Sequence, residues 1–514
     1  MRHFQSGYHT GGDSDERLGA APLHASKPTV SLPANVVLGV RWISLASATR
    51  ATAHALQLVI LARLLAPADF GIMAVVATLT TYVQLLANLE LSGAIIRGPE
   101  PSADQRSGLY WFGLAASGSL GLALAAAGHW IADFYGHPVL RPLLALAAVY
   151  LVVWAGWQQL QAFAERELRF GRVALIEAVS AIVGLVASVW LALLGAGVYA
   201  LMGGLLASGG ASALLGWRLL AGGWRPRLRL RLSEFREYLR VGGYTTASDV
   251  TAMLGYHVDI ILGARFLGAG ATGIYSVPKS LCQQVLVAIG PVATRVGLPV
   301  MAKASGDAAK LRRIYLRTIR LTASATFPLF ALLCVFAPEL VRLLLGPQWD
   351  HAAPVLRIFA AWGLMRGAVY PIRALAVAAG RSELLFRWSA AFLGLHVVAV
   401  YAAGPYGPVG LSIALSIVAL LALAGNWLFL VLPLTGARAA AYFGELAVPL
   451  AITAASAAPA WLAAWLAGGA TAGLAAGMIA GAAAYLGLSR AFNRDCLDAM
   501  RSLLFMRGAA AQDA

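Results

Sequence analysis

Long apolar segments separated by short polar turns recur along almost the whole chain. Fourteen of them follow residue 35. Each has roughly 20 residues, enough for a helix to cross the hydrocarbon core of a bilayer and satisfy its own backbone groups there. The pattern therefore predicts an all-α polytopic membrane protein with about 14 transmembrane helices, at residues 36–62, 70–96, 108–132, 139–163, 173–194, 197–217, 240–263, 273–298, 316–336, 354–379, 385–403, 408–432, 443–466 and 470–489.

Composition agrees with this pattern and excludes a soluble fold. The 514 residues are 60% hydrophobic and only 12% charged, whereas an ordinary soluble domain is roughly 45–50% apolar and 25% charged. The three cysteines lie far apart, so we expect no disulfide framework. None of the nine histidines has the spacing of metal ligands, so we expect no metal site.

The net charge of +16 could indicate a nucleic-acid partner, but its distribution points elsewhere. If the amino terminus is inside, the inner loops and tails hold 28 of the Lys and Arg residues. The outer loops hold four, Arg63, Arg141, Arg265 and Arg342, and seven lie within the predicted helices. Because cytoplasmic loops are enriched in basic residues, we expect both termini in the cytoplasm and no nucleic-acid partner.

A weak internal repeat divides the chain. Residues Val59–Ala74 align with Ile261–Ser276 at a shift of 202, and Val139–Arg141 align with Val355–Arg357 at a shift of 216. The repeat predicts two pseudo-symmetric six-helix lobes of the same orientation plus two C-terminal helices, and transporters with such repeats bind substrate between the lobes. The expected organisation is a disordered cytoplasmic tail (1–35), an N-lobe (36–220), a basic cytoplasmic linker (221–240), a C-lobe (241–435), two added helices (436–490) and a second cytoplasmic tail (491–514).

The sequence has no catalytic constellation. Gly268, Gly270 and Gly273 match a dinucleotide-binding pattern, but they lie in a short turn between two membrane segments and do not follow a strand. We therefore expect neither a cofactor nor enzymatic activity.

Basic residues inside apolar segments are the candidate functional groups, because charge in a membrane is costly and marks a pathway or a paired site. Trp362, Arg366, Tyr370 and Arg373 share one side of segment 354–379, within about 40° of one direction at helical spacing. With Arg50 and Lys279 they form a hypothetical binding site in a central cavity, in which Arg binds phosphate oxygens and the aromatic rings stack on sugars.

Two other interpretations of these charges stay open. Arg366 could pair with a carboxylate such as Asp249, while Arg373 extends to the cytoplasmic surface. Asp249, near the middle of its segment, is also a candidate coupling site for H⁺ or Na⁺, because a lone carboxylate there can exchange an ion during transport.

Three stretches carry a family resemblance. They are LARLLAPADFGIMAVVATLTTYVQLLANLELSGAII (Leu61–Ile96), HVDIILGARFLGAGATGIYS (His257–Ser276) and LLLGPQWDHAAPVLRIFA (Leu343–Ala360). They resemble bacterial oligosaccharide flippases of the Wzx type, in the polysaccharide transporter branch of the multidrug/oligosaccharidyl-lipid/polysaccharide exporter superfamily. The resemblance covers residues 35–435.

The resemblance implies a fourteen-helix flippase in the bacterial cytoplasmic membrane. It would move undecaprenyl-diphosphate-linked repeat units between the leaflets by alternating access, for exopolysaccharide, capsule or O-antigen, beside a polysaccharide polymerase and glycosyltransferases. Asp259, Arg265, Gly273 and Tyr275 match the family's second-lobe signature, for which the resemblance implies a structural role at the outer turn.

Two alternatives predict other features. An ion-coupled drug exporter of the same superfamily needs acidic groups in its cavity, whereas this chain has mostly basic ones. A membrane glycosyltransferase or polysaccharide polymerase needs catalytic carboxylates and large loops, but the longest outer loop, 337–353, has only 17 residues.

Overall fold

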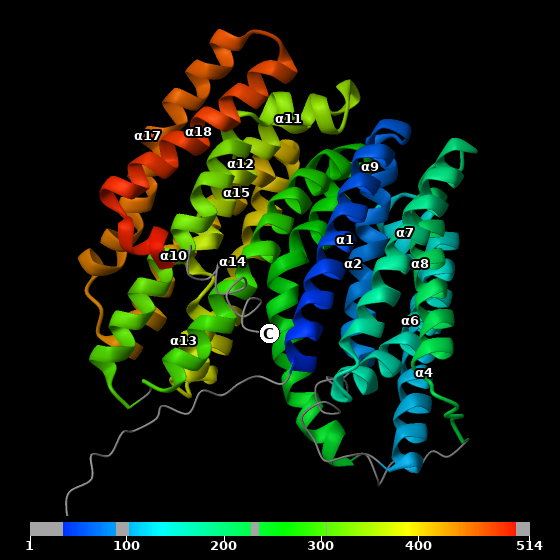
Figure 1. The fold of residues 1–514 in the computed structure, drawn as a ribbon. Helices are drawn as coiled ribbons and strands as arrows, with labels where there is room; N and C mark the ends of the chain where they lie inside the picture. Colours follow the sequence, from blue (N-terminus) through cyan, green and yellow to red (C-terminus); the bar gives the residue numbers. More distant parts are fainter. Residues whose placement is uncertain (1–33, 89–101, 228–235, 305, 500–514) are drawn as a thin grey trace, which may run out of the picture.

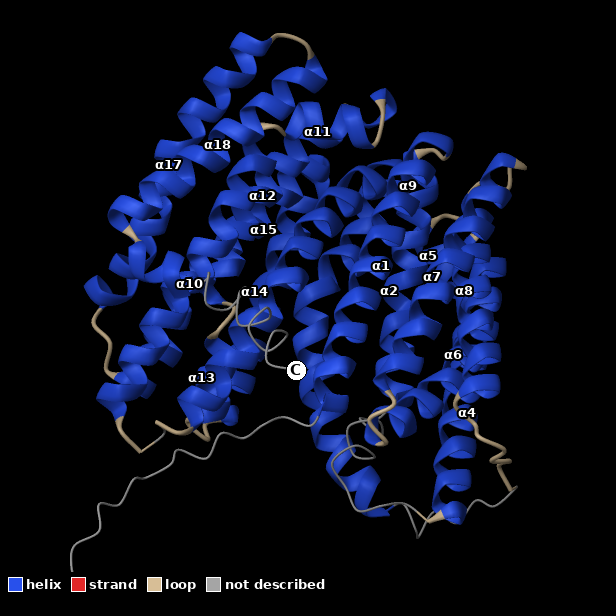
Figure 2. Ribbon diagram, in the orientation of Figure 1, coloured by secondary structure: helices blue, strands red, loops and turns tan. Residues whose placement is uncertain are grey.

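The computed structural model describes residues 34–88, 102–227, 236–304 and 306–499. Within these ranges the regular elements are helices, and no strand occurs (Figures 1 and 2). The all-α fold class predicted from the apolar segments is confirmed. The predicted tail at 1–33, the end of the chain at 500–514 and linker residues 228–235 lie outside the described residues.

The first half of the chain supplies helices that cover its predicted segments. Residues 89–96 of the second predicted segment lie outside the described residues, and the third segment is divided at Ala127 into a long helix and a short one. The described helices are α1 (Ala34–Leu64), α2 (Pro67–Asn88), α4 (Ala103–Ala126), α5 (Gly128–Tyr135), α6 (Leu140–Arg166), α7 (Phe170–Leu193) and α8 (Val198–Leu219).

A helical hairpin, α9 (Arg236–Ala302), contains two predicted segments. Gly268 interrupts it with φ 72° and ψ 173°, a conformation that only glycine adopts readily. The chain turns back there, because Lys279 contacts Asp259, although 20 residues of straight helix would place them about 30 Å apart. The two arms of α9 are therefore neighbouring helices joined by a tight turn.

The second half contains more interrupted helices. Its described elements are α10 (Ala308–Val335), α11 (Ala337–Leu344), the 3₁₀ turn η2 (Pro347–Trp349), α12 (Ala352–Val369), α13 (Ile372–Ala378), α14 (Ser382–Ala403), the 3₁₀ turn η3 (Gly404–Tyr406), α15 (Gly407–Asn426), the π-helical turn η4 (Trp427–Val431), α16 (Leu432–Thr435), α17 (Ala439–Ala467) and α18 (Ala470–Phe492). The predicted helix at 354–379 is divided between α12 and α13, because Pro371 has no N–H to continue the hydrogen-bond ladder.

Length and hydropathy support the membrane assignment. Eleven helical stretches in the described part of the chain are long and apolar enough to cross a membrane. Two of them, Met253–Val287 and Glu383–Thr435, each contain parts of two predicted segments. The segment at 36–62 lies within α1, so every predicted segment overlaps a helix in the part of the chain that the structure describes.

The helices of the two halves lie on opposite sides of α9 (Figure 1). On one side α7 packs against α1 and α8, and on the other side α10 packs against α12 and α17. The α17–α18 turn, α11 and the turn of α9 are at the top of Figure 1, which we call the upper end. The charge distribution predicts that the upper end faces outward.

The two copies of the repeat meet at the upper end, between α2 and α9. A β carbon on Gly71 would lie 1.9 Å from the backbone oxygen of Ala269, and one on Gly273 would lie 1.8 Å from that of Pro67. The shift of 202 relates both pairs, 67 to 269 and 71 to 273. The contact is therefore reciprocal, like a two-fold interface in which the same patch occurs on both sides.

Candidate functional site

Arg366 lies on α12 among aromatic rings. Its guanidinium carbon is 5.3 Å from the ring centroid of Tyr256 on α9 and 5.7 Å from that of Trp362, one turn earlier on α12. The Trp362 side chain is buried and packs edge-on against Phe359 at 5.8 Å. The rings therefore hold the cation from two helices.

No carboxylate of the described side chains lies within 4.0 Å of Arg366. A cation over an aromatic face gains about 0.5–2 kcal/mol, but the rings do not neutralise its charge. Arg366 follows the first residue of α12 by 14 positions, so it lies about 21 Å below the upper end at the rise of an α-helix. A cation with no counter-ion among the described side chains is thus positioned deep in the bundle, where an anionic group could bind.

The predicted cationic stripe is only partly assembled around these rings. Trp362 and Arg366 share the Tyr256 contact, and Tyr370 follows at the end of α12. Arg373 is on α13, exposed and nearer the lower end. The alternative pairing of Arg366 with Asp249 involves a side chain outside the described residues.

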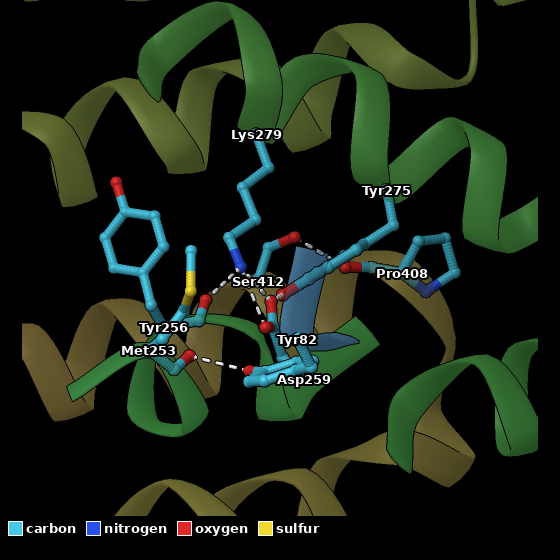
Figure 3. Close-up of polar contacts among 8 residues, drawn as sticks. All are labelled: Tyr82, Met253, Tyr256, Asp259, Tyr275, Lys279, Pro408 and Ser412. Carbon is cyan, nitrogen blue, oxygen red and sulfur yellow. Dashed lines mark hydrogen bonds and ion pairs between the residues drawn. The ribbon is translucent and has the colours of Figure 1, made fainter. Parts of the chain in front are cut away.

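Lys279 belongs to a buried ionic network (Figure 3). Its ammonium nitrogen lies 2.7 and 2.6 Å from the two carboxylate oxygens of Asp259 and 2.9 Å from the backbone oxygen of Tyr256. The Tyr275 hydroxyl also donates to Asp259. The same ammonium is 5.7 Å from the Tyr256 ring centroid, so the network and Arg366 share one aromatic side chain.

Arg50 lies in the first half of the chain, against α7. Its guanidinium donates to Glu177 at 3.1 Å, and the Arg50 side chain is 46% exposed. Gln57, two turns further along α1, donates to Ser188 at 3.1 Å. This side of α1 therefore faces α7, and substrate binding by Arg50 stays a prediction.

Contacts between the two halves close the upper end. The Ala62 backbone oxygen, near the end of α1, accepts hydrogen bonds from the Trp349 indole at 2.9 Å and the Gln348 amide at 2.6 Å. The Trp349 ring packs edge-on against Phe70 at 5.3 Å. The Gly-Pro-Gln-Trp motif before α12 therefore caps α1, whose last carbonyl groups have no partner within their own helix.

Sequence reasoning missed Tyr256 as the ring shared by both cations, and it did not pair Lys279 with Asp259. A signal for the pair existed, because residues 259 and 279 are equally distant from position 269 in the glycine-containing turn. Residues at equal distances from a tight hairpin turn lie side by side. Tyr256 carried no comparable signal, since its neighbour Arg366 belongs to a distant part of the chain.

Comparisons with known proteins agree with this architecture. Residues 60–354, more than half of the chain, match the family described as "Polysaccharide biosynthesis protein". The chain is 25% identical to the lipopolysaccharide biosynthesis protein WzxC of Escherichia coli (strain K12), over 82% of this chain and 86% of that protein. It is 26% identical to the teichuronic acid biosynthesis protein TuaB of Bacillus subtilis (strain 168), over 83% of this chain and 88% of that protein.

Among solved structures, the fold is similar to that of the lipid II flippase MurJ in its inward closed conformation. The TM-score is 0.70 at 14% sequence identity, over 88% of this chain and 99% of that one. A likeness at such low identity shows the shared fold. The family match, which covers more than half of the sequence, shows that this membrane protein belongs to the polysaccharide biosynthesis protein family.

Proposed function

We propose that this protein is a flippase for lipid-linked oligosaccharides. It moves undecaprenyl-diphosphate-linked repeat units across the bacterial cytoplasmic membrane by alternating access, for exopolysaccharide, capsule or O-antigen. The substrate comes from glycosyltransferases on the inner side and passes to a polymerase on the outer side. Relatives named for lipopolysaccharide and teichuronic acid biosynthesis support this class of substrate.

The observation that carries the proposal is the Arg366 guanidinium, held over the Tyr256 and Trp362 rings without a carboxylate partner among the described side chains. A diphosphate is the complementary ligand, since the planar guanidinium donates two parallel hydrogen bonds to phosphate oxygens. Aromatic faces beside it can cover the apolar face of a sugar ring. The arrangement therefore fits the junction between the diphosphate and the first sugar.

The closed upper end supports an alternating-access mechanism. The Gly71–Gly273 contact and the capping of α1 by Gln348 and Trp349 join the two halves at that end. A substrate held near Arg366 can leave on that side only after these contacts separate. The structure therefore represents a state closed at its predicted outer end.

An ion-coupled drug exporter is the second candidate, because the fold is also similar to that of a MATE crystal structure, at a TM-score of 0.51 and 14% identity. Its cationic substrates would be repelled by Arg366. A coupling ion, H⁺ or Na⁺ at Asp249, remains a proposal that either transporter could use. The positive charge of Arg366, which has no carboxylate partner among the described side chains, favours the oligosaccharide flippase.

Deletion of the gene in its native host tests the class of function. We expect lipid-linked oligosaccharide to accumulate in the inner leaflet and the surface polysaccharide to disappear, with both restored by the intact gene. The leaflet is identified in spheroplasts, where periodate oxidises the exposed sugars to aldehydes. A membrane-impermeant hydrazide then labels these aldehydes. Normal labelling of the outer leaflet in the deletion strain would contradict the proposal.

A further inference from the structure

The ammonium group of Lys279 lies in a cradle of oxygen atoms (Figure 3). The cradle consists of both Asp259 carboxylate oxygens and the Tyr256 backbone oxygen, all 2.6–2.9 Å from the nitrogen. An ammonium has three N–H donors, so these three acceptors satisfy it completely. The Lys279 and Asp259 side chains are only 3% and 2% exposed, so water does not substitute for any of these contacts.

The oxygens of the cradle and the cation come from different arms of the α9 hairpin. Tyr256 and Asp259 precede the turn at Gly268, whereas Lys279 follows it. The Tyr275 hydroxyl, also from the second arm, holds the Asp259 carboxylate by a hydrogen bond. The Asp259 carboxylate is therefore held in place by Tyr275, and the Tyr256 oxygen is held by the helix backbone. Lys279 contributes only the positive charge between them.

The first copy of the repeat has other residues at the positions of this ion pair. At the shift of 202, Asp259 corresponds to Gln57 and Lys279 corresponds to Ala77. Gln57 donates to Ser188 on α7, so the corresponding position of the first copy makes a neutral contact with another helix in place of an ion pair. The charged network is an addition to the second copy.

We propose that the α9 hairpin contains a monovalent-cation site that Lys279 fills with its own ammonium group. Carboxylate and backbone carbonyl oxygens are the ligands that hard cations take in proteins, and such groups coordinate Na⁺ in membrane transporters. The tethered ammonium makes a free Na⁺ at Asp259 unnecessary. Shortening the lysine removes the ammonium and opens the cradle to Na⁺ or methylammonium, because a buried unpaired carboxylate is strongly unfavourable.

The test is thermal unfolding of the purified full chain and its Lys279→Ala variant in detergent. Choline chloride, whose cation is too bulky for the cradle, is replaced stepwise by NaCl or by methylammonium chloride at constant ionic strength. We expect the wild-type midpoint to be the same in choline and in methylammonium, because the Lys279 ammonium already occupies the cradle. The variant should unfold at a lower temperature in choline. Its midpoint should rise with the logarithm of the Na⁺ or methylammonium concentration, as expected for a ligand that binds only the folded state.

The matched control is Lys279→Ala combined with Asp259→Asn, which removes the carboxylate and should abolish the cation response. Lys279→Ala protein with the same midpoint in all three salts would overturn the proposal. A wild-type protein stabilised by methylammonium, or a Lys279→Ala variant that yields no folded protein in either NaCl or methylammonium chloride, would also overturn it. The measurement needs no transport, so its outcome is independent of the proposed flippase function.

Discussion

At the scale of single residues, the chain has three arrangements around the basic groups of its apolar helices. Arg50 pairs with Glu177, Lys279 is enclosed by Asp259, and Arg366 lies against aromatic rings. An ion pair offsets part of the free energy needed to place a charge in a membrane, because the two partners neutralise each other. Only the third arrangement, among these described side chains, leaves a net charge for a ligand.

The sequence identified these basic residues but not their partners. A charge inside an apolar segment is visible from its neighbours alone, which is why Arg50, Lys279 and Arg366 could be singled out. Their partners depend on helix packing, and Arg50 and Glu177 are separated by 127 positions. The weak repeat indicates how the lobes are arranged. It does not determine how each helix is rotated about its own axis, and that rotation decides which side chains meet.

Replacing Arg366 by Gln should impair transport by removing the charge while keeping a polar side chain of similar length. A hydrogen bond to a charged group contributes about 1.5–3 kcal/mol, so we expect substrate flipping to fall about ten- to hundredfold. Arg366→Lys should retain part of the activity, since it keeps the charge and loses the planar fork. Flipping is measured in vesicles of matched protein content.

The matched control is Arg342→Gln, which removes an Arg whose exposed guanidinium lies 3.8 Å from Asp350 near the upper end. Exposed pairs of this kind contribute little to stability, so transport should stay near the wild-type rate. Equal loss in both variants, or full activity of Arg366→Gln, would exclude a specific role for the Arg366 charge.

At the scale of helices, the apolar pattern predicted well which segments are helical and how long they are. It did not predict where these helices are interrupted. The break between α12 and α13 follows from Pro371, which the sequence displays. The π-helical turn η4 between α15 and α16 was not predicted, although Pro433 at the start of α16 has no N–H to continue the hydrogen-bond ladder into this turn. The reciprocal contact of Gly71 and Gly273 was also not predicted, because the repeat aligned the two glycines without indicating that they would touch.

Gly273→Ala should weaken closure at the upper end. The added methyl group would meet the Pro67 backbone oxygen at 1.8 Å, and backbone atoms cannot rotate away as a side chain can, so the two halves must separate. We expect faster labelling of an Ala264→Cys reporter, which is 5% exposed in the structure, by a membrane-impermeant maleimide. The three native cysteines are replaced by serine in all the proteins compared.

Gly270→Ala is the control within the same turn, since a β carbon there has no atom within 4 Å. It should leave the labelling rate unchanged. If both substitutions increase labelling equally, or neither does, the Gly71–Gly273 contact does not control closure.

At the scale of the whole molecule, the apolar pattern predicted the all-α membrane fold, and the repeat indicated which parts of the two halves correspond. The repeat copies lie against each other at one end of the bundle, and the described helices divide about α9 (Figure 1). The exact lobe boundaries at residues 220, 240 and 435 remain predictions. They depend partly on linker residues 228–235, which are outside the described part of the chain.

Orientation follows from the 28 basic residues assigned to the inner side against four on the outer side. Green fluorescent protein fused after Ala514 should fluoresce, because it folds in the cytoplasm. Alkaline phosphatase inserted at Gly468, in the turn between α17 and α18 at the upper end, should be active because that turn is predicted to be outside. The reverse pattern of reporter activity would show that the charge-based orientation is wrong.

The central claim, that this chain moves lipid-linked oligosaccharide between leaflets, is tested most directly in vesicles containing only the purified protein. A fluorescent undecaprenyl-diphosphate oligosaccharide is incorporated, and dithionite then quenches the molecules exposed on the outside. We predict that quenching in wild-type vesicles continues beyond the outer-leaflet share, because flipping supplies molecules from the inner leaflet. A plateau identical to that of protein-free vesicles, with intact protein present, would contradict the account.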